Sequence, residues 1–439
     1  MLGLNNYSTK LLNNARLFNN GSVIRLRSNT ATSSFEIIQR ERKVSTNNYN
    51  PSPVVISRGK GIFMWDVEGK KYYDFVGGFA TLNQGHCHPK IIKAMTDQLN
   101  KLHHTSRAIF HDSLYELNEF LTEQFEYEKV LNMNTGVEGG ESSIKIARKW
   151  GYRVKKIPHN QAQVVFAHGN FWGRTIAAIS ASTDPISFNE FGPHVPGYQL
   201  VPYDDLGKLE QALRNPNVCA FMVEPLQGEA GAVVPTLGYL KGVRELCTKY
   251  NVLWIDDEVQ AGLGRTGKML AVDYENVKPD LLILGKALSG GVYPVSVVLG
   301  NSEVMDVLTP GTHGSTYGGN ALACKVALAS LDVIISEGLV ENAFKMGEIF
   351  RTELTARLDK DKVIQVRGRG LLNAIILNTK SVTNIYKLNN EMKTNGLISK
   401  PIGSDALRFS PPLILTEEQL REGIDIIVNT INNFTNNYL

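Results

Sequence analysis

Short apolar runs alternate with amphipathic helical patterns through the middle of the sequence. Helical periodicity appears between some of these runs, at Asp205–Arg214 and Gly238–Tyr250. Runs of four or five residues that are apolar on both faces are typical of strands in a sheet covered on both sides. The pattern predicts a large α/β domain with a mostly parallel sheet. The apolar runs are Val164–Ala167, Cys219–Val223, Val252–Ile255, Leu281–Leu284 and Val295–Leu299.

A first α/β unit precedes this region. Helical patterns at Pro89–Leu102 and Ser113–Gln124 lead to an apolar strand pattern at Lys129–Met133. The glycine-containing stretch TGVEGGE then predicts a turn, and Ser142–Arg153 has helical periodicity. Two further helices are predicted after the sheet, at Ala321–Glu337 and Leu339–Leu358.

The two ends of the chain have short β-like runs separated by turns. We therefore expect a smaller α+β domain built from both chain ends, residues 36–90 and 339–439, beside a large domain of residues 91–338. The first end predicts a small antiparallel meander, and the second ends in a helix. The runs are Val54–Ile56, Ile62–Asp66 and Lys71–Phe75 at one end, with Val363–Val366, Leu371–Leu377, Leu407–Ser410 and the helix Glu417–Asn433 at the other.

The first 35 residues have a different composition from the rest. They contain no Asp or Glu but carry Lys10, Arg16, Arg25 and Arg27, and several apolar residues fall on one face of a helix. This basic, acid-free and amphipathic composition predicts a mitochondrial transit peptide and a protein of the mitochondrial matrix. The alternative is an Asn-rich tail without a targeting role, in a cytoplasmic protein.

Composition and charge exclude several classes of function. With 439 residues and 43% hydrophobic content the chain can bury a large core, and 46 basic against 43 acidic residues argue against nucleic-acid binding. No apolar run is long enough to span a membrane. The four cysteines are widely spaced without a CxxC pair, so we expect neither a disulfide framework nor a metal site.

A lysine follows one of the apolar strands. The run Leu281–Leu284 brings Gly285 and Lys286 to its carboxyl end, the edge where open α/β sheets bind ligands. Desolvation lowers the pKa of an ammonium group, and the neutral amine can form a Schiff base with a carbonyl. A solvated surface lysine is the simpler interpretation of this segment alone.

Two other motifs complete a chemical set with Lys286. Thr135–Gly140 lies between a strand and a helix, where backbone N–H groups and the helix dipole favour an anion, although a plain tight turn remains possible. The acidic run Asp256-Asp257-Glu258 ends another strand, and a buried carboxylate there needs a cation such as a metal or a protonated ring nitrogen. A Schiff-base lysine, a pyridinium partner and a phosphate cradle are the requirements of pyridoxal 5'-phosphate.

The order of six motifs resembles one enzyme family. GVEGGE, NFWGRT, EPLQGEAG, DDEVQAGLGRTG, DLLILGKALSGG and HGSTYGGN together are similar to the class III (ω-amino acid) aminotransferases of fold type I. The resemblance extends from about Asn47 to Leu439, and NQGHCHPK, RGRGLLNA and RFSPP are similar to the ornithine-using members of the class.

The resemblance implies a reaction and leaves rivals. The δ-amino group of L-ornithine would pass to 2-oxoglutarate, giving glutamate and glutamate 5-semialdehyde, which cyclises to pyrroline-5-carboxylate and connects arginine catabolism to proline biosynthesis. A class III aminotransferase acting on 4-aminobutyrate or N-acetylornithine is the nearest alternative. A mutase or racemase on the same fold, and a relative kept only for binding, are more distant ones.

The resemblance also implies roles for the cofactor-binding residues. Lys286 would be the Schiff-base lysine and proton shuttle, Asp257 would pair with the pyridine nitrogen, and Gln260 would contact the ring hydroxyl. The remaining contacts would come from stacking by Phe171, from phosphate-binding backbone N–H groups of Gly136 and Val137, and from Ser315 and Thr316 of a neighbouring subunit. Such shared sites imply a homodimer or a higher homo-oligomer.

Substrate recognition would use two arginines, because carboxylates must be held at two depths. By resemblance, Arg174 with Tyr49 would bind the distal carboxylate, and Arg408 would bind the α-carboxylate of 2-oxoglutarate. Glu229 would pair with Arg408 during the ornithine half-reaction and mask its charge. Phe79 departs from the family pattern, since ornithine-using members carry tyrosine there, and loss of the hydroxyl puts the preference for ornithine in doubt.

Overall fold

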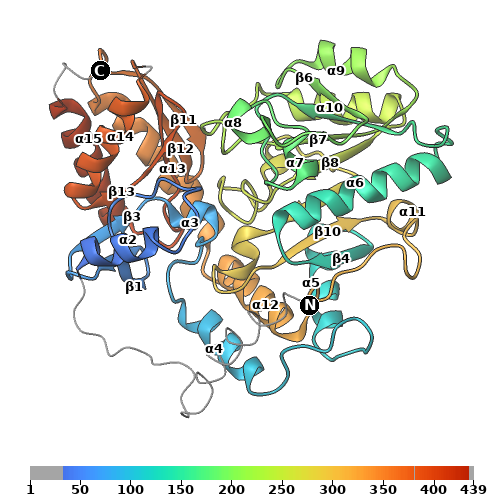
Figure 1. Cartoon of the computed structure of the whole chain (residues 1–439), viewed down its shortest axis with the longest axis horizontal. Helices are drawn as coiled ribbons and strands as arrows, with labels where there is room; N and C mark the ends of the chain where they lie inside the picture. Colours follow the sequence, from blue (N-terminus) through green and yellow to red (C-terminus); the bar gives the residue numbers. More distant parts are fainter. Residues whose placement is uncertain (1–32, 380, 435–439) are drawn as a thin grey trace, which may run out of the picture. The chain divides into compact units, whose positions relative to one another are not determined.

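The computed structural model describes residues 33–379 and 381–434 (Figure 1). Most of the predicted transit peptide lies outside the described residues. The chain forms two compact units, one comprising the residues up to Ser57 together with Asp66–Lys70, and the other Arg58–Trp65 with everything from Lys71. In the smaller unit, α2 (Ser34–Arg42) begins with a capping box between Ser33 and Glu36.

The centre of the larger unit is a seven-stranded sheet with the order β4-β10-β9-β8-β7-β5-β6 (Figure 1). Four neighbouring pairs are parallel, and only β10 runs antiparallel, to both β4 and β9. The mostly parallel α/β sheet is therefore confirmed. Its strands are β4 (Lys129–Met133), β5 (Gln163–Ala167), β6 (Tyr198–Val201), β7 (Val218–Val223), β8 (Leu253–Asp257), β9 (Leu281–Leu284) and β10 (Ser296–Gly300).

Helices cover both faces of this sheet, as predicted. Successive residues of one strand enter different cores: Val164 packs with Ile144 and Ile146 of α6, while Val165 shares the other core with Leu240 and other residues of α10. The long helices of this part are α4 (Pro89–Leu99), α5 (Leu114–Phe125), α6 (Gly136–Arg153), α9 (Leu206–Leu213), α10 (Tyr239–Lys249) and α12 (Ala321–Ser336). Short turns are α3 (Gly77–Ala80), α7 (Ile176–Ile179), α8 (Pro185–Phe188), α11 (Ser302–Met305) and the 3-10 helices η2 (Ala271–Tyr274) and η3 (Lys286–Ser289).

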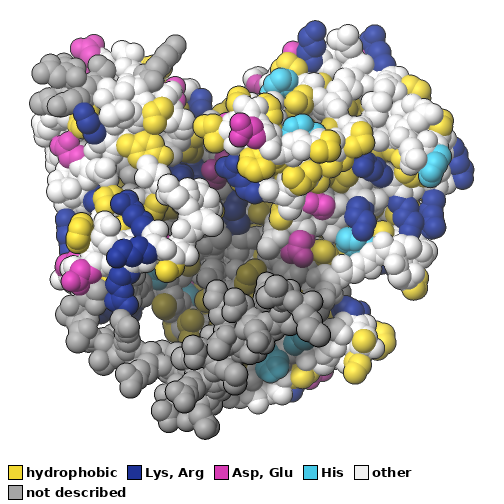
Figure 2. All heavy atoms as spheres, in the orientation of Figure 1, with side chains coloured by type: hydrophobic (Ala, Val, Ile, Leu, Met, Phe, Trp, Pro, Cys, Tyr) yellow, Lys and Arg dark blue, Asp and Glu magenta, His cyan; other side chains and the backbone are white. Residues whose placement is uncertain are grey.

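Helix α6 begins six residues earlier than predicted, so the expected turn TGVEGGE was wrong. Gly139 and Gly140 are part of the helix, and their lack of a side chain lets the helix pack closely against its neighbours. A Cβ on Gly139 would lie 2.8 Å from Ile283 Cγ2, and one on Gly140 would lie 2.7 Å from Trp172 Cε3. The opposite face of α6 is basic, and Figure 2 shows Lys and Arg side chains gathered on the surface over this helix. These are Lys145, Arg148, Lys149 and Arg153.

Two four-stranded sheets use the chain ends. One has the order β1-β2-β3-β13 and the other β11-β12-β15-β14. The parallel pairing of β13 with β3, which sets Leu397 beside Tyr73, joins the two ends of the chain as expected. The strands are β1 (Ile56–Lys60), β2 (Phe63–Asp66), β3 (Lys71–Asp74), β11 (Val363–Arg369), β12 (Leu372–Leu377), β13 (Leu397–Ile398), β14 (Lys400–Ile402) and β15 (Ala406–Phe409), with helices α13 (Leu339–Arg357), α14 (Val382–Thr394) and α15 (Glu417–Asn433).

Some elements of the chain ends differ from the prediction. The expected strand at Val54–Ile56 was wrong, because β1 extends from Ile56 to Lys60 and is almost wholly exposed, so its residues are polar. Helix α14 was not predicted, although Ile385, Leu388 and Met392 form its buried face. Among the described residues, no helix is long and apolar enough to cross a membrane.

Candidate active site

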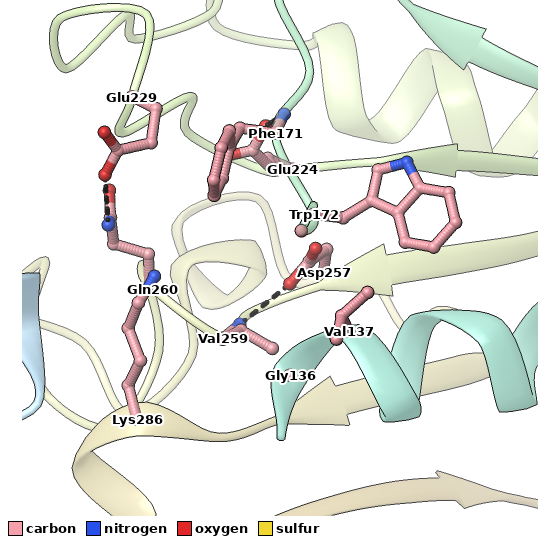
Figure 3. Close-up of a pocket in the computed structure, with 11 residues that line it drawn as sticks. Gly136, Val137, Phe171, Trp172, Glu224, Glu229, Asp257, Val259, Gln260 and Lys286 are labelled. Atoms are coloured by element: carbon pink, nitrogen blue, oxygen red, sulfur yellow. Dashed lines mark hydrogen bonds between the residues drawn. The ribbon is translucent and has the colours of Figure 1, made fainter. Parts of the chain in front are cut away.

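The carboxyl ends of β7, β8 and β9 bring three functional groups to one edge of the sheet. Val223 pairs with Asp256, and Asp257 pairs with Ile283, so Glu224, Asp257 and the residues after β9 follow at similar heights. They line a cavity of about 210 Å³ (Figure 3). Seven of the predicted site residues line it. The lining consists of Gly136, Val137, Phe171, Trp172, Gly173, Glu224, Glu229, Asp257, Val259, Gln260 and Lys286.

Lys286 begins the 3-10 turn η3, which Gly285 separates from the end of β9. Its φ of +42° lies in the left-handed region, which is unfavourable for a lysine and is common at functional sites. Burial lowers the pKa of the Lys286 ammonium, although the nearby carboxylates of Glu229 and Asp257 act in the opposite direction. Figure 3 shows its side chain extending toward the side of the cavity where Gln260 and Glu229 are bonded. The neutral amine of such a lysine is a nucleophile.

Asp257 supplies a buried carboxylate to the cavity. Its Oδ1 accepts a hydrogen bond from Val259 N at 3.0 Å, and no salt bridge within 4 Å joins it to a cation among the described residues. Burial raises the pKa of Asp257 to about 6, against the lowering effects of Val259 N–H and of Lys286. The group is therefore suited to a cationic partner, as a protonated pyridine nitrogen would be.

The other two acids of the run, Asp256 and Glu258, are buried in the protein interior. Asp256 is completely buried, and neither of its carboxylate oxygens has a hydrogen-bond partner. Burial raises the pKa of Asp256 well above its usual range, with the charge of Glu258 as a further cause. Glu258 accepts a hydrogen bond from Val272 N, yet burial raises its pKa to about 8. No group of three His, Cys, Asp or Glu side chains could hold a metal ion in the part of the chain that the structure describes.

The N-terminus of α6 forms the wall near Val259. A Cβ on Gly136 would lie 2.8 Å from Val259 Cγ1, so glycine permits the backbone to stand close to the cavity. The unpaired N–H groups of a helix's first turn attract anions such as phosphate. Gly136 and Lys286 also line a second cavity of about 320 Å³ with Asn134 and Ser289.

The predicted partner-subunit residues lie close to this wall within the same chain. Asn134 Nδ2 donates a hydrogen bond to Ser315 Oγ at 2.9 Å, and Thr316 is exposed. Neither residue lines the cavity that contains Asp257.

A buried charge pair occupies the far side of the cavity from the helix. Arg408 Nη1 lies 2.5 Å from Glu229 Oε1, and Gln260 Nε2 donates to the same oxygen at 3.0 Å. Burial raises the pKa of Glu229, but Arg408 and Gln260 outweigh it and hold the pKa at about 2. Arg408 is only 1% exposed, and its Nε and Nη2 have no hydrogen-bond partner. This guanidinium can still bind a second carboxylate.

The other predicted substrate residues differ in their setting. Arg174 is exposed, donates from Nη1 to Ser187 Oγ at 2.6 Å, and lies 5.3 Å from the centroid of the Phe171 ring. Tyr49 belongs to the smaller unit, where its side chain is 78% exposed.

Phe79 is presented by a left-handed turn. The φ angles of Gly77, Gly78, Phe79 and Ala80 are all between +54° and +68°, and each non-glycine residue in that region costs about 1–2 kcal/mol. Asp74 Oδ1 holds the turn by accepting hydrogen bonds from the N–H groups of Val76 and Gly77. The ring centroid of Phe79 lies 5.6 Å from Arg408 Cζ.

Three residues of the site were not predicted. Glu224 Oε1 accepts a hydrogen bond from Phe171 N at 3.0 Å, and burial together with Asp257 raises its pKa well above its usual range. Its position directly after the apolar run Cys219–Val223 was a signal that could have found it. Trp172 lines the cavity, and the Lys400 Nζ atom lies 5.3 Å from the Phe79 ring centroid.

Comparison with known proteins gives a consistent result. The family described as Aminotransferase class-III matches residues 44–431. The mitochondrial ornithine aminotransferase of Drosophila melanogaster is 59% identical over 395 residues, covering 90% of this chain and 91% of that protein.

Two solved structures are also similar. The ornithine aminotransferase of Toxoplasma gondii, with PLP partly occupying its active site, has a TM-score of 0.89 and 48% identity, covering 91% and 94% of the two chains. The acetylornithine aminotransferase of Elizabethkingia anophelis has a TM-score of 0.84 and 47% identity, covering 92% and 100%.

Proposed function

The chain belongs to the class III aminotransferases, and we propose that it transfers the δ-amino group of L-ornithine to 2-oxoglutarate. The products are glutamate and glutamate 5-semialdehyde, which cyclises to pyrroline-5-carboxylate. The observation that carries this proposal is the bond between the buried Arg408 and Glu229, a carboxylate that lines the cavity of Lys286. It provides a carboxylate-binding arginine that can be masked, which a donor reacting at its distal amine requires.

Pyridoxal 5'-phosphate is the cofactor that the residues of the cavity fit. Asp257 offers a buried carboxylate without a cation, Gly136 and Val137 offer the start of a helix, and Phe171 offers an aromatic face. Gln260 would contact the ring hydroxyl. When bound, the cofactor supplies an electron sink for the carbon that loses a proton.

Lys286 would carry the cofactor and move the proton. Its Nζ would hold the proton that leaves the carbon bearing the reacting amine. Burial lowers the pKa of the Lys286 ammonium and so favours the neutral amine that a general base requires. Burial and the charge of Asp257 raise the pKa of Glu224, which favours its protonated form, and Glu224 Oε1 accepts a hydrogen bond from Phe171 N.

The two arginines would bind carboxylates in turn. Arg174, with Tyr49, would bind the carboxylate distal from the reacting carbon in both substrates. Arg408 would bind the α-carboxylate of 2-oxoglutarate through its unpaired Nε and Nη2 atoms, which form a bidentate edge. With ornithine, Glu229 would stay bonded to Arg408, so the α-carboxylate of the donor would not bind Arg408.

Assembly, location and domain division are further parts of the proposal. Ser315 and Thr316 would complete the phosphate site of a neighbouring subunit in a homodimer or higher homo-oligomer. The mitochondrial name of the Drosophila relative supports a mitochondrial matrix location. Residues 91–338 would form the cofactor-binding domain, with residues 36–90 and 339–439 in the smaller domain.

The test is a panel of amino donors with 2-oxoglutarate and the full-length protein loaded with pyridoxal phosphate. Ornithine, N-acetylornithine and 4-aminobutyrate are offered separately, glutamate is measured, and pyrroline-5-carboxylate is trapped. We expect kcat/KM for ornithine to exceed the others by about tenfold or more. Faster turnover of N-acetylornithine, which the Elizabethkingia relative and Phe79 make the second candidate, would replace the assignment.

The lysine chemistry has its own control. Lys286→Ala should lose turnover with every donor, whereas Lys93→Ala, at an exposed lysine of α4, should leave turnover unchanged. Wild-type turnover by Lys286→Ala would refute the mechanism.

A further inference from the structure

Lys400 places a second cation beside Arg408. β14 pairs antiparallel with β15, so that Lys400 stands directly opposite Arg408. Residues directly opposite in an antiparallel pair project from the same face, with Cβ atoms about 5 Å apart, and like charges in that arrangement repel. A favourable interaction elsewhere in the site must therefore offset the repulsion.

Both cations lie against the same aromatic ring. The Phe79 centroid is 5.3 Å from Lys400 Nζ and 5.6 Å from Arg408 Cζ, distances at which a ring face attracts positive charge. The left-handed turn Gly77–Ala80 fixes this ring in place. Phe79 thus keeps the half-buried Lys400 side chain at the rim of the Arg408 site.

The Lys400 ammonium has no fixed anionic partner. Among the described residues it forms no hydrogen bond or ion pair, whereas Arg408 is bonded to Glu229. Burial lowers the pKa of Lys400, and the carboxylate of Glu229 raises it, so the field of Glu229 reaches both cations. The geometry provides one ionised carboxylate with two possible partners.

Glu229 needs a second partner during the reaction. In the proposed function, the α-carboxylate of 2-oxoglutarate takes Arg408, and Glu229 must leave it. Burial alone raises the pKa of Glu229, and Arg408 is the main reason that it stays ionised. A displaced, largely buried carboxylate without a cation would oppose binding of the keto acid.

We propose that Lys400 is a positioning residue of this exchange: it pairs with Glu229 when a substrate α-carboxylate occupies Arg408. Lys400 then acts on 2-oxoglutarate through Glu229, with no contact to the reacting atoms. This inference rests on the proposed function only in that a keto acid's α-carboxylate binds Arg408. In the ornithine half-reaction Glu229 stays on Arg408, so Lys400 has little effect there.

The test separates the two half-reactions. Enzyme whose cofactor has been converted to its amino form is mixed with 2-oxoglutarate, and cofactor absorbance is followed as the keto-acid concentration varies. Lys400→Met keeps the apolar stem against Phe79 and removes the charge. We expect the half-saturating 2-oxoglutarate concentration to rise about tenfold, and that of ornithine to change less than about twofold. Lys400→Arg should stay within about threefold of wild type, and Lys93→Met is the exposed control.

A double-mutant cycle distinguishes this role from a structural one. If Lys400 acts through Glu229, then Lys400→Met should have less than about a twofold effect on 2-oxoglutarate in a Glu229→Gln background. Equal weakening of both substrates, or an unchanged tenfold effect in that background, would overturn the proposal. Should another donor replace ornithine, that donor can load the enzyme, so the keto-acid half-reaction still gives an answer.

Discussion

Glu229→Gln is the substitution that most directly examines the masked arginine. The glutamine keeps the size of the side chain and can still accept a hydrogen bond from Arg408, but it removes the negative charge. Arg408 would then present an uncompensated guanidinium to the cavity. We expect α-carboxylates to be drawn to Arg408 in both half-reactions, so that glutamate improves as an amino donor relative to ornithine.

The structure sets the size of the effect. Arg408 and Gln260 hold the pKa of Glu229 at about 2, against an ordinary value of 4.5, despite the opposing effect of burial. That difference corresponds to roughly 3 kcal/mol of net stabilisation of the ionised form. A substrate carboxylate must displace this interaction in the wild type. Since the glutamine retains part of the hydrogen bonding, we expect a change of about 10–100-fold in the ratio of kcat/KM for glutamate to that for ornithine.

The assay compares glutamate and ornithine as donors for the wild type and the variant under the same conditions. Glu303→Gln, at an exposed position of α11, serves as the matched control. A ratio that changes by less than about twofold would refute the masking role of Glu229. An equal loss with both donors would show that Glu229 supports the site without selecting between substrates.

Three other substitutions address stability and cofactor binding. Burial raises the pKa of the Asp256 carboxyl, so the folded protein binds the carboxyl proton more tightly than the unfolded chain does. This proton binding stabilises the folded state fully below about pH 4. As the pH rises toward the folded pKa, the free energy of unfolding falls by up to about 1.4 kcal/mol per pH unit. Asp256→Asn should flatten that slope in denaturant titrations between pH 5 and 8, and parallel curves would contradict the explanation. Gly136→Ala should weaken pyridoxal phosphate about tenfold in a fluorescence titration, because its Cβ meets Val259, while Gly207→Ala should not. Arg265→Met should lower the free energy of unfolding by about 3 kcal/mol or more, because this buried guanidinium donates to Asn83 Oδ1 and to two carbonyl oxygens; a loss under about 1 kcal/mol would show that these groups find other partners.

The central sheet was predictable because its strands are buried on both faces and therefore apolar throughout. Prediction from apolar patterns failed where the structure uses glycines in a helix or polar residues in a strand. Gly139 and Gly140 look like a turn in sequence, yet they are helical because larger side chains would collide with Ile283 and Trp172. Strand β1 was misplaced because an exposed strand has no apolar pattern to show.

The residues of the site also differ in how far the sequence alone could predict them. Asp257 is the last residue of β8 and Lys286 lies two residues after the end of β9, so strand ends alone place them at one edge of the sheet. Lys400 reaches the site through the register of β14 against β15, and Phe79 through a left-handed turn. Neither the register of a three-residue strand nor an unfavourable φ is specified by local composition, since both are imposed by the surrounding packing.

The charges of the site explain why it would bind anionic groups. Arg408 is bonded to one firmly ionised carboxylate, Glu229, and Lys400 stands opposite Arg408 without an ion pair among the described residues. Burial raises the pKa of Glu224 well above its usual range and that of Asp257 to about 6. The surroundings of Arg408 therefore carry two cations against one carboxylate, which favours a dicarboxylic keto acid, and the N-terminus of α6 favours a phosphate group. Burial favours the neutral amine of Lys286, against the opposing effect of the Glu229 and Asp257 carboxylates. The charges of the site thus attract the anionic groups, while burial favours the reactive form of the base.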